Sequence, residues 1–376
     1  MYKSYKFRLY PTKAQKEQLS RIFGCCRYVY NWGLRLRTDA WHNEHKRVSY
    51  YDTIKLLTKL KHDGEHDWLN DVHSNCTQYA LLHLQAAFAQ FWGKKAKYPK
   101  FKQKGSAQSA SFYCGLKNAV AYIGKLGVLK VNWDSRFNPT MTSKTTTISM
   151  DSAGRYFVSF LVEEDIKPLK KLKTAVGIDL GLESFVTLSD GKKFKHPKLI
   201  RAKQVHLRRL QKSLSRKVKG SKNRNKARLR LARLHCRIAD ARQDFLQKLS
   251  TKIIRENQTI AVEDLGVRNM QENHCLAGSI ADASWFEFIR QLQYKAEWYG
   301  RTLVKIDRFY PSSKRCNDCG HILDKLPLDK RSWTCPLCNI RHDRDINAAK
   351  NILAAGHAVI ACGDGVRPSR VAFAMR

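Results

Sequence analysis

Acidic residues are scarce in this sequence, and that scarcity first indicates what the chain contacts. Its 376 residues contain 32 Asp and Glu against 70 Lys and Arg, a formal net charge of +38 at pH 7. A charge of this size opposes compaction unless a partner neutralises it, and polyanions such as nucleic acids are the commonest partners. Because 43% of the residues are hydrophobic, disorder is excluded and a folded protein of two or three domains is expected.

Long apolar runs are absent as well. No stretch approaches the roughly 18 apolar residues that a membrane span needs. The first residues, MYKSYKFRLYPTKAQ, are too polar and basic for a secretory leader. No internal repeat is visible. We therefore expect no membrane partner, and a cytoplasmic or nucleoid-associated protein.

Disulfides are not expected, although the chain has 11 cysteines. Four of them form two C-x-x-C pairs, which in a cytosolic chain indicates a metal site. Two such pairs, separated by 15 residues, can close a tetrahedral, structural Zn²⁺ site with four thiolates, namely Cys316, Cys319, Cys335 and Cys338. Four unligated thiols or a redox pair are the alternatives. His321 and His342 flank the pairs and are expected on the surface.

The pattern of polar and apolar residues changes twice in the first half of the chain. Residues 2–10 alternate polar and apolar side chains and predict a strand. Residues 11–95 carry apolar side chains at helical spacing, starting with Thr12 as N-cap and Gln15 in a capping box. Residues 105–165 contain short alternating segments with glycine turns, which predict a small β-barrel or sheet. The first strand is expected to join it, so that the helical block is an insertion.

A basic segment dominates the second half. From residue 192 to 248 there are 21 Lys and Arg against 2 Asp and no Glu. The pattern predicts two long helices split by KGSKNRNK, a helical hairpin at about residues 200–250. Its outer faces suit a nucleic-acid backbone. A solvated basic face without a partner is the alternative.

Three acids stand at the ends of apolar segments, where an unused carboxylate is costly. Asp179 lies in the strand TAVGIDLG, Glu263 ends the strand TIAVEDL, and Asp345 begins an Ala-rich helix in HDRDINAAKNI. A strand–hairpin–helix–strand–helix order brings such acids together in an RNase H-like sheet. Three carboxylates of this kind can hold two Mg²⁺ ions for phosphodiester hydrolysis.

Each acid has an alternative interpretation. Asp179 could belong to an ordinary strand-end turn, and Asp264 competes with Glu263 for the role in its segment. Asp343 and Asp345 could be a helix cap and a first-turn acid, which are common. Asp343 resembles the cap, whereas Asp345 heads the apolar face of the helix.

These motifs, in this order, resemble TnpB, the OrfB-type protein of small bacterial transposons and a relative of type V CRISPR effectors. The resemblance rests on GIDLG, VEDL, the four cysteines and HDRDINAAKNI. It extends to YKFRLYPTKAQ, YPKFK, RQDFLQKLS, WFEFIRQLQYKAEWYG and the G-x-x-VRP tail, and so covers nearly the whole chain.

The resemblance implies an RNA-guided DNA endonuclease. A noncoding, omega-type guide RNA would pair with one strand of double-stranded DNA beside a short transposon-adjacent motif, and a RuvC-type site would cut both strands. No obligate protein partner is implied. The catalytic, Mg²⁺-binding acids would be Asp179, Glu263 and Asp345, and the pattern D-x-N-A-A selects Asp345 over Asp343.

The expected fold class is α+β and multidomain. It combines an RNase H-like (RuvC) α/β nuclease domain that carries a four-cysteine zinc-ribbon insertion with an N-terminal β-barrel wedge domain that carries a helical insertion. The expected parts are a wedge domain at 1–10 and 105–172, a helical recognition domain at 11–104, a nuclease domain at 173–310 and 341–356, a zinc ribbon at 311–340, and a disordered tail at 357–376.

Candidate nucleic-acid contacts fall into two groups. Tyr50, Gln78 and Tyr79 could read bases of the adjacent motif, since Gln pairs bidentately with adenine. Solvated polar side chains are the alternative there. The second group comprises basic residues of the helical hairpin, which would follow the backbone of a guide heteroduplex: Arg208, Arg209, Lys212, Arg216, Lys222, Arg224 and Lys226.

Three other functions compete with a guided nuclease. A nuclease-inactive guided regulator would share the charge and zinc but would not need the acids. A DNA transposase would use the same triad for strand transfer. A zinc-ribbon RNA-binding protein of the translation machinery would leave Asp179 and Glu263 without a role.

Overall fold

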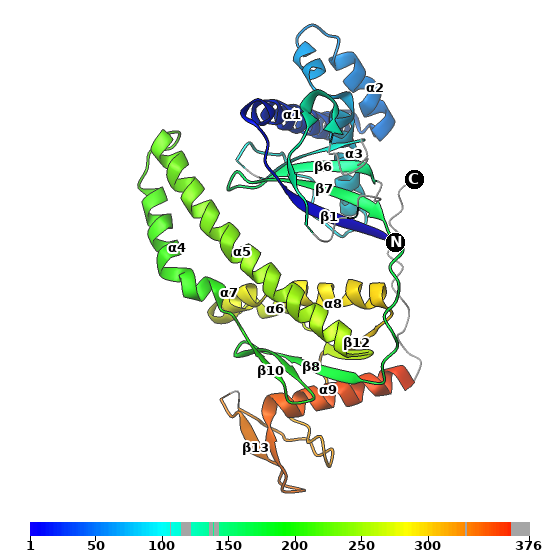
Figure 1. Cartoon of the computed structure of the whole chain (residues 1–376), viewed down its shortest axis with the longest axis vertical. Coiled ribbons are helices and arrows are strands. Elements are labelled where there is room, and N and C mark those ends of the chain that lie inside the picture. Colours follow the sequence, from blue (N-terminus) through cyan, green and yellow to red (C-terminus); the bar gives the residue numbers. More distant parts are fainter. Residues whose placement is uncertain (106, 114–121, 135–137, 139–142, 328, 362–376) are drawn as a thin grey trace. The chain divides into compact units, whose positions relative to one another are not determined.

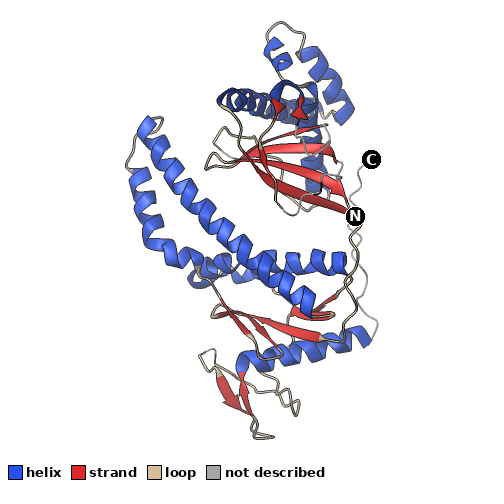
Figure 2. Cartoon of the chain, viewed as in Figure 1, coloured by secondary structure: helices blue, strands red, loops and turns tan. Residues whose placement is uncertain are grey.

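The computed structural model describes residues 1–105, 107–113, 122–134, 138, 143–327 and 329–361 (Figure 1). The chain divides into two compact units: Met1–Asp165 with Lys217–Arg233, and Ile166–Arg216 with the chain from Leu234 on. Helices and strands occur in both units (Figure 2), which agrees with the predicted α+β class. None of the described helices combines the length and apolar composition that crossing a bilayer requires.

The first unit contains a five-stranded antiparallel sheet in the order β2-β6-β7-β1-β5. Strand β1 pairs with β7 along its whole length, from Tyr2 opposite Glu163 to Leu9 opposite Tyr156, so the N-terminal strand joins the later strands as predicted. Among the described residues no pairing joins β5 to β2, so barrel closure stays a prediction. The strands are β1 (Tyr2–Leu9), β2 (Gln108–Phe112), β5 (Val131–Asn132), β6 (Ser143–Met150) and β7 (Tyr156–Glu163), with β3 (Tyr122–Ile123) and β4 (Gly127–Val128) as a separate pair.

Three helices interrupt this sheet in the sequence, between β1 and β2. They are α1 (Lys13–Glu44), α2 (Tyr50–Leu60) and α3 (Ser74–Trp92). Helix α1 starts at the predicted capping box, in which Gln15 N donates to the Thr12 hydroxyl at 3.3 Å and Thr12 N donates to the Gln15 side chain at 3.0 Å. Its apolar face is buried with α3 and the sheet in one core.

The second unit is built on a mixed sheet in the order β10-β9-β8-β11-β12. Strands β8, β11 and β12 are parallel, and β9 and β10 extend the sheet antiparallel. The strands are β8 (Ala175–Leu180), β9 (Ser184–Leu188), β10 (Lys193–Lys195), β11 (Thr259–Glu263) and β12 (Thr302–Ile306).

Helices cover both faces of this mixed sheet. Because strand side chains alternate between faces, Val176 and Ile178 pack in one core with α5 and α8, whereas Ala261 packs with Ile352 of α9 on the other face. The helices are α4 (Leu199–Ser215), α5 (Lys222–Glu256), α6 (Val267–Met270), α7 (His274–Ala283), α8 (Trp285–Tyr299) and α9 (Arg344–Ala361). A small antiparallel pair, β13 (Ser332–Thr334) and β14 (Arg341–Asp343), precedes α9.

Three boundaries differ from the predicted ones. Helix α5 begins at Lys222, inside the predicted break KGSKNRNK, because Asn does not end a helix when neighbouring residues favour one. Strand β14 extends to Asp343, beyond the predicted ribbon end at residue 340, since it pairs with β13. Residues 357–361 continue α9, where a disordered tail was expected, because its apolar face packs on the sheet. The rest of that tail, including G-x-x-VRP, lies outside the described residues.

Candidate active site

Two of the predicted acids lie side by side at the carboxyl ends of parallel strands. The register of β8 and β11 pairs Ile178 with Val262, so Asp179 and Glu263 are the next residues of their strands. Ile178 and Val262 point into the core with α5 and α8. By alternation, both carboxylates point to the opposite face, which α9 covers. The strand-end position is the usual place for functional side chains in such sheets.

A glycine brings the third acid to this face. A Cβ at Gly177 would overlap the carbonyl oxygen of Ala349 and approach the backbone nitrogen of Leu353 to 2.7 Å, so α9 lies directly on β8. Similarly, a Cβ at Gly356 would lie 2.5 Å from the Cβ of Ala261 on β11. Gly177 shares the strand face of Asp179, and Asp345 lies one helical turn before Ala349. This packing places Asp345 beside Asp179.

The three acids interact electrostatically. Burial, and then the charges of Glu263 and Asp345, raise the pKa of Asp179 to about 8, although Arg344 and Lys193 oppose the rise. Burial also raises the pKa of Glu263, and a hydrogen bond that Ser312 donates to its carboxylate opposes that rise. Buried like charges are arranged in this way where a cation or a proton is to be held.

The structure also separates the competing acids. Asp343 is the cap of α9: its carboxylate accepts from the backbone N–H groups of Asp345 at 3.1 Å and Ile346 at 3.0 Å. Partial burial opposes ionisation of Asp343, but the bond from Lys193 and those backbone donors together lower its pKa. Asp264 turns to Arg308, at 2.8 Å, and is half exposed. Glu263 and Asp345 are therefore the members of each pair that face Asp179.

Two cations beside Asp345 were not predicted from the sequence. Lys193 Nζ lies 3.8 Å and Arg331 Nη1 3.7 Å from the Asp345 carboxylate, and Arg331 also pairs with Glu183 at 2.9 Å. Nothing local distinguishes these residues from the many other cations of the chain. Lys193 follows the turn between β9 and β10, and Arg331 lies shortly before Cys335. Only the tertiary structure brings both of them to Asp345.

The three carboxylates are chemically suited to bind divalent cations. Carboxylate oxygens are the ligands that Mg²⁺ prefers, and Asp179 and Glu263 are held by neighbouring strands. The carboxylates are not among the described groups whose ligand atoms all lie within 4.8 Å of one another. Like charges repel at short range, and Asp345 is drawn toward Lys193 and Arg331.

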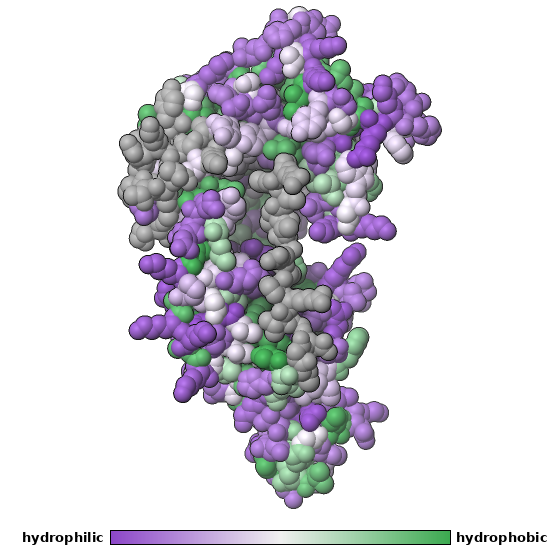
Figure 3. All heavy atoms as spheres, turned by 90° about the vertical axis from the view of Figure 1, so that its right-hand side faces the viewer, coloured by the Kyte–Doolittle hydropathy of each residue, from purple (hydrophilic) through white to green (hydrophobic). Residues whose placement is uncertain are grey.

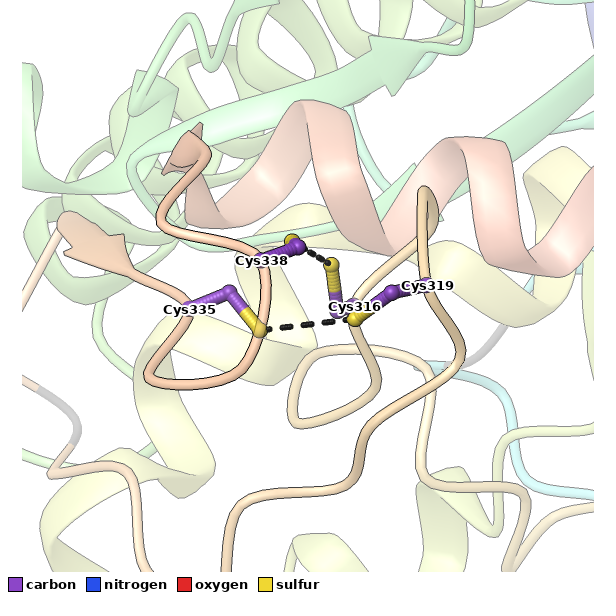
Figure 4. Close-up of side chains that lie close together, drawn as sticks. All are labelled: Cys316, Cys319, Cys335 and Cys338. Atoms are coloured by element: carbon purple, nitrogen blue, oxygen red, sulfur yellow. Dashed lines mark hydrogen bonds between the residues drawn. The ribbon is translucent and has the colours of Figure 1, made fainter.

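The four predicted cysteines do converge, on two loops before α9 (Figure 4). Their sulfur atoms all lie within 4.8 Å of one another, with 3.6 Å between Cys316 and Cys338 and 3.5 Å between Cys319 and Cys335. Cys316 and Cys335 are fully buried. This cluster can hold a metal ion, and four thiolates at this spacing fit tetrahedral Zn²⁺.

His342 is not the surface residue that the sequence suggested. It is buried, its ring packs against Trp333, and its Nε2 lies 3.0 Å from the sulfur of Cys316. The pairing of β14 with β13 places it there. His321 is half-buried, and its carbonyl oxygen accepts a hydrogen bond from Cys316 N at 2.7 Å.

The predicted base readers share one pocket of the first unit. Tyr50 at the start of α2 and Gln78 and Tyr79 on α3 line a cavity of about 220 Å³ together with Asn75, Leu82 and Tyr113. Amide and phenol groups that line an open pocket are suited to contact base edges. The structure thus places Tyr50 in one pocket with Gln78 and Tyr79, which lie on another helix.

The predicted backbone contacts divide between the units. Arg208, Arg209, Lys212 and Arg216 are exposed on or next to α4 in the second unit. Lys222 and Lys226 are exposed on the first turns of α5, which belong to the first unit, whereas Arg224 is half-buried and donates to the carbonyl of Lys217 at 2.7 Å. Hydrophilic side chains cover much of the face shown in Figure 3.

Family models match three parts of the chain. The OrfB_IS605 model, described as "Probable transposase", matches residues 159–274. The model "Cas12f1-like, TNB domain" matches residues 285–352, which include the four cysteines and Asp345. A "Helix-turn-helix domain" model of the same OrfB_IS605 group matches residues 1–46.

Full-length relatives and a solved structure agree with these matches. A protein of Streptomyces pristinaespiralis, named "Putative RNA-guided DNA endonuclease", is 48% identical over 98% of this chain and 92% of its own. The InsQ protein of Escherichia coli K12, which has the same description, is 34% identical over 98% of this chain and 95% of its own. A structure described as the "Cas12f1-sgRNA-target DNA complex" shares the fold, with a TM-score of 0.52 and 14% identity over 94% of this chain and 98% of its own. The chain therefore belongs to the OrfB/IS605 family of TnpB proteins.

Proposed function

We propose that this protein is the RNA-guided DNA endonuclease of a transposon, which cuts double-stranded DNA next to a short transposon-adjacent motif. The observation that carries the proposal is the arrangement of Asp179, Glu263 and Asp345 on one face of the mixed sheet, where burial and then the charges of Glu263 and Asp345 raise the pKa of Asp179. Two full-length relatives bear the name of this activity.

The second unit would contain the nuclease domain, of the RNase H-like (RuvC) type, which the sequence predicts at residues 173–310 and 341–356; Lys217–Arg233 within that range belong to the first unit. The three acids of the nuclease domain would hold two Mg²⁺ ions, which supply an activated water and stabilise the leaving 3′ oxygen when bound. Ser312 fixes the Glu263 carboxylate by its hydrogen bond. Lys193 and Arg331 balance the charge of Asp345, and Asp179 would release its proton when a cation binds.

The residues before α9 would form a structural zinc ribbon. Cys316, Cys319, Cys335 and Cys338 would be its four ligands, and a site closed by four thiolates leaves no position for substrate. Because Asp343 ends β14 and caps α9, the metal would stabilise the segment that positions Asp345.

The partners in this proposal are a guide RNA of the omega type and the target DNA, with no obligate protein partner. Exposed cations on α4 and at the start of α5 would contact the RNA backbone or the guide heteroduplex. The pocket of Tyr50, Gln78 and Tyr79, in a helical recognition domain inserted in a wedge domain, would read the adjacent motif. Such a protein would act in the cytoplasm, where RNA and chromosome meet in a prokaryote.

The proposal is tested by co-purifying the protein with RNA transcribed from the DNA that flanks its gene. A plasmid library that matches the 3′ end of this RNA, beside randomised flanks, is then offered with Mg²⁺. Linear product next to one flank sequence is expected from the wild type. Asp179→Ala should abolish cutting and retain RNA, because it removes only an oxygen ligand.

Other outcomes distinguish the competing functions. Bound RNA without cutting by the wild type would identify a guided DNA-binding regulator. Joined rather than linear DNA would identify a transposase. Equal loss of RNA binding and cutting in Asp179→Ala would contradict the role given to this acid.

A further inference from the structure

A recess of the second unit lies at the carboxyl ends of β11 and β12. It has a volume of about 530 Å³ and is lined by Asp264, Lys305, Ile306, Asp307, Arg308 and Phe309. Asp264 directly follows Glu263 in the chain, and β11 and β12 are parallel, so their ends lie at the same edge of the sheet. The recess and the acids thus belong to one region of the second unit.

Phe309 is unusually exposed for its type. Its exposed fraction of 87% is the highest among the large hydrophobic residues that the structure describes. Single exposed hydrophobic residues are common and by themselves indicate nothing. The surroundings of Phe309 are what distinguish it.

Hydrogen bonds of the residues before and after Phe309 hold the loop that carries it. Arg308 donates to the carbonyl oxygen of Asp264 at 2.9 Å and to its carboxylate at 2.8 Å, and Phe309 N donates to the Asp307 carboxylate at 2.7 Å. Three residues later, Ser312 donates to the carboxylate of Glu263. The same short loop therefore hydrogen-bonds to Glu263 of the acidic centre and carries an exposed aromatic ring.

We propose that Phe309 stacks against a base of the unpaired DNA strand that the acidic centre cuts, while Lys305 contacts its phosphates. The inference rests on the proposed nuclease function, which places a DNA strand at Glu263. A base inside a duplex has no free face, so the ring selects unpaired nucleotides. Stacking accepts any base, as required of an enzyme whose target sequence is read by guide pairing.

The direct test is photocross-linking of the full-length protein to a short single-stranded DNA that carries 5-iodouracil. A cross-link at Phe309 is expected, and it should disappear in Phe309→Ala. Phe286 offers a matched control, because it is also a phenylalanine of the second unit, 71% exposed, on α8. Phe286→Ala should keep the cross-link. Cross-links that map only outside residues 305–310 would overturn the proposal.

A second test uses the guided complex and a target in which single nucleotides near the cut are replaced by abasic sites. At low DNA concentration, Phe309→Ala should slow cutting by about 5- to 150-fold, the range expected for losing one stacked base. Phe309→Tyr should restore the rate. At saturating DNA the defect should shrink, because stacking acts on binding.

The effects of the abasic substitution and of Phe309→Ala on the cutting rate should not be additive. One abasic position should slow the wild type as much as Phe309→Ala does, and should have little further effect on the variant. Additive effects, or wild-type rates in Phe309→Ala, would overturn stacking and leave the nuclease intact. If the wild type does not cut at all, the proposed nuclease function fails, and the cross-link still decides whether Phe309 contacts unpaired DNA.

Discussion

At the residue scale, the properties of each acid depend on what surrounds it. Asp343 and Asp345 are two residues apart, yet one caps α9 through backbone donors and the other faces Asp179. Glu263 accepts a bond from Ser312, and its neighbour Asp264 pairs with Arg308. Neighbouring carboxylates of the same type thus acquire different roles from hydrogen bonds and from nearby charges.

The raised pKa of Asp179 makes stability depend on pH. Its folded pKa of about 8 exceeds the unfolded value near 3.9. Between about pH 4 and 8 the native protein therefore binds more protons than the unfolded chain, and its stability falls as the pH rises. Asp179→Asn removes this effect, so its Tm relative to that of the wild type should increase from pH 4 to pH 8 without divalent cations.

Thermal melts across that pH range measure this difference, and Mg²⁺ provides the control. Added Mg²⁺ should raise the Tm of the wild type at pH 8 and have little effect on Asp179→Asn, since the cation replaces the proton as the partner of the carboxylate. Glu263→Gln should change in the same direction as Asp179→Asn, because burial also raises the pKa of Glu263. A Tm difference that does not vary with pH would contradict the electrostatic account.

At the element scale, the contact of α9 with β8 and β11 organises the site. The helix carries Asp345 and approaches the strands through Gly177 and Gly356, where a side chain would meet backbone or Cβ atoms. The segment with the four converging cysteines lies directly before this helix. Two elements therefore set where the third acid stands relative to the two on the strands.

Gly177→Ala tests this contact. Its new methyl group meets the backbone of α9, which cannot rotate away, so a loss of about 3 kcal/mol or more in unfolding free energy is expected. Urea unfolding measures it. Gly278→Ala on α7 is the matched control: nothing lies within 4 Å of its Cβ, and the change should be neutral or slightly stabilising. Equal stability of the two variants would mean that α9 does not lie directly on the sheet.

Cys335→Ser tests the metal. Loss of one of four thiolates should remove most bound zinc, measured by elemental analysis, and increase hydrogen exchange in residues 311–343. Cys275→Ser, at an exposed cysteine of α7 outside the cluster, should leave both unchanged. A wild type without zinc, or exchange unaffected by Cys335→Ser, would remove the structural role given to the metal.

At the scale of the whole molecule, the net charge of +38 sets the interaction with nucleic acid. No local feature requires so many cations, and self-repulsion among them destabilises a compact chain. A polyanion removes this repulsion and releases its own counterions on binding. We therefore expect the protein to be markedly more stable with its RNA than without it.

Removing charge from α4 tests where this polyanion binds. Arg208, Arg209 and Lys212, all changed to Ala, should weaken RNA binding and lower the slope of log affinity against log salt by about one for each phosphate that the variant no longer neutralises. Filter binding at several salt concentrations gives the slope. Arg290→Ala is the control, because Arg290 already pairs with Glu287 at 2.7 Å. Equal slopes for the triple variant and the wild type would place the RNA elsewhere.

The sequence by itself determined the features that local chemistry encodes. Two C-x-x-C pairs specified the four sulfur atoms that converge, the capping box specified the start of α1, and apolar runs that end in acids marked the strands of Asp179 and Glu263. These patterns depend on residues a few positions apart, so periodicity and spacing reveal them.

Only the tertiary structure decided which side chains meet across long separations. It turned Asp264 toward Arg308, buried His342 against Cys316, and placed Lys193 and Arg331 beside Asp345. It also left Phe309 exposed on the loop whose Ser312 donates a hydrogen bond to Glu263. Such neighbours follow from strand register and from how closely a helix approaches a sheet, and these depend on packing between distant segments, which no local pattern of residues contains.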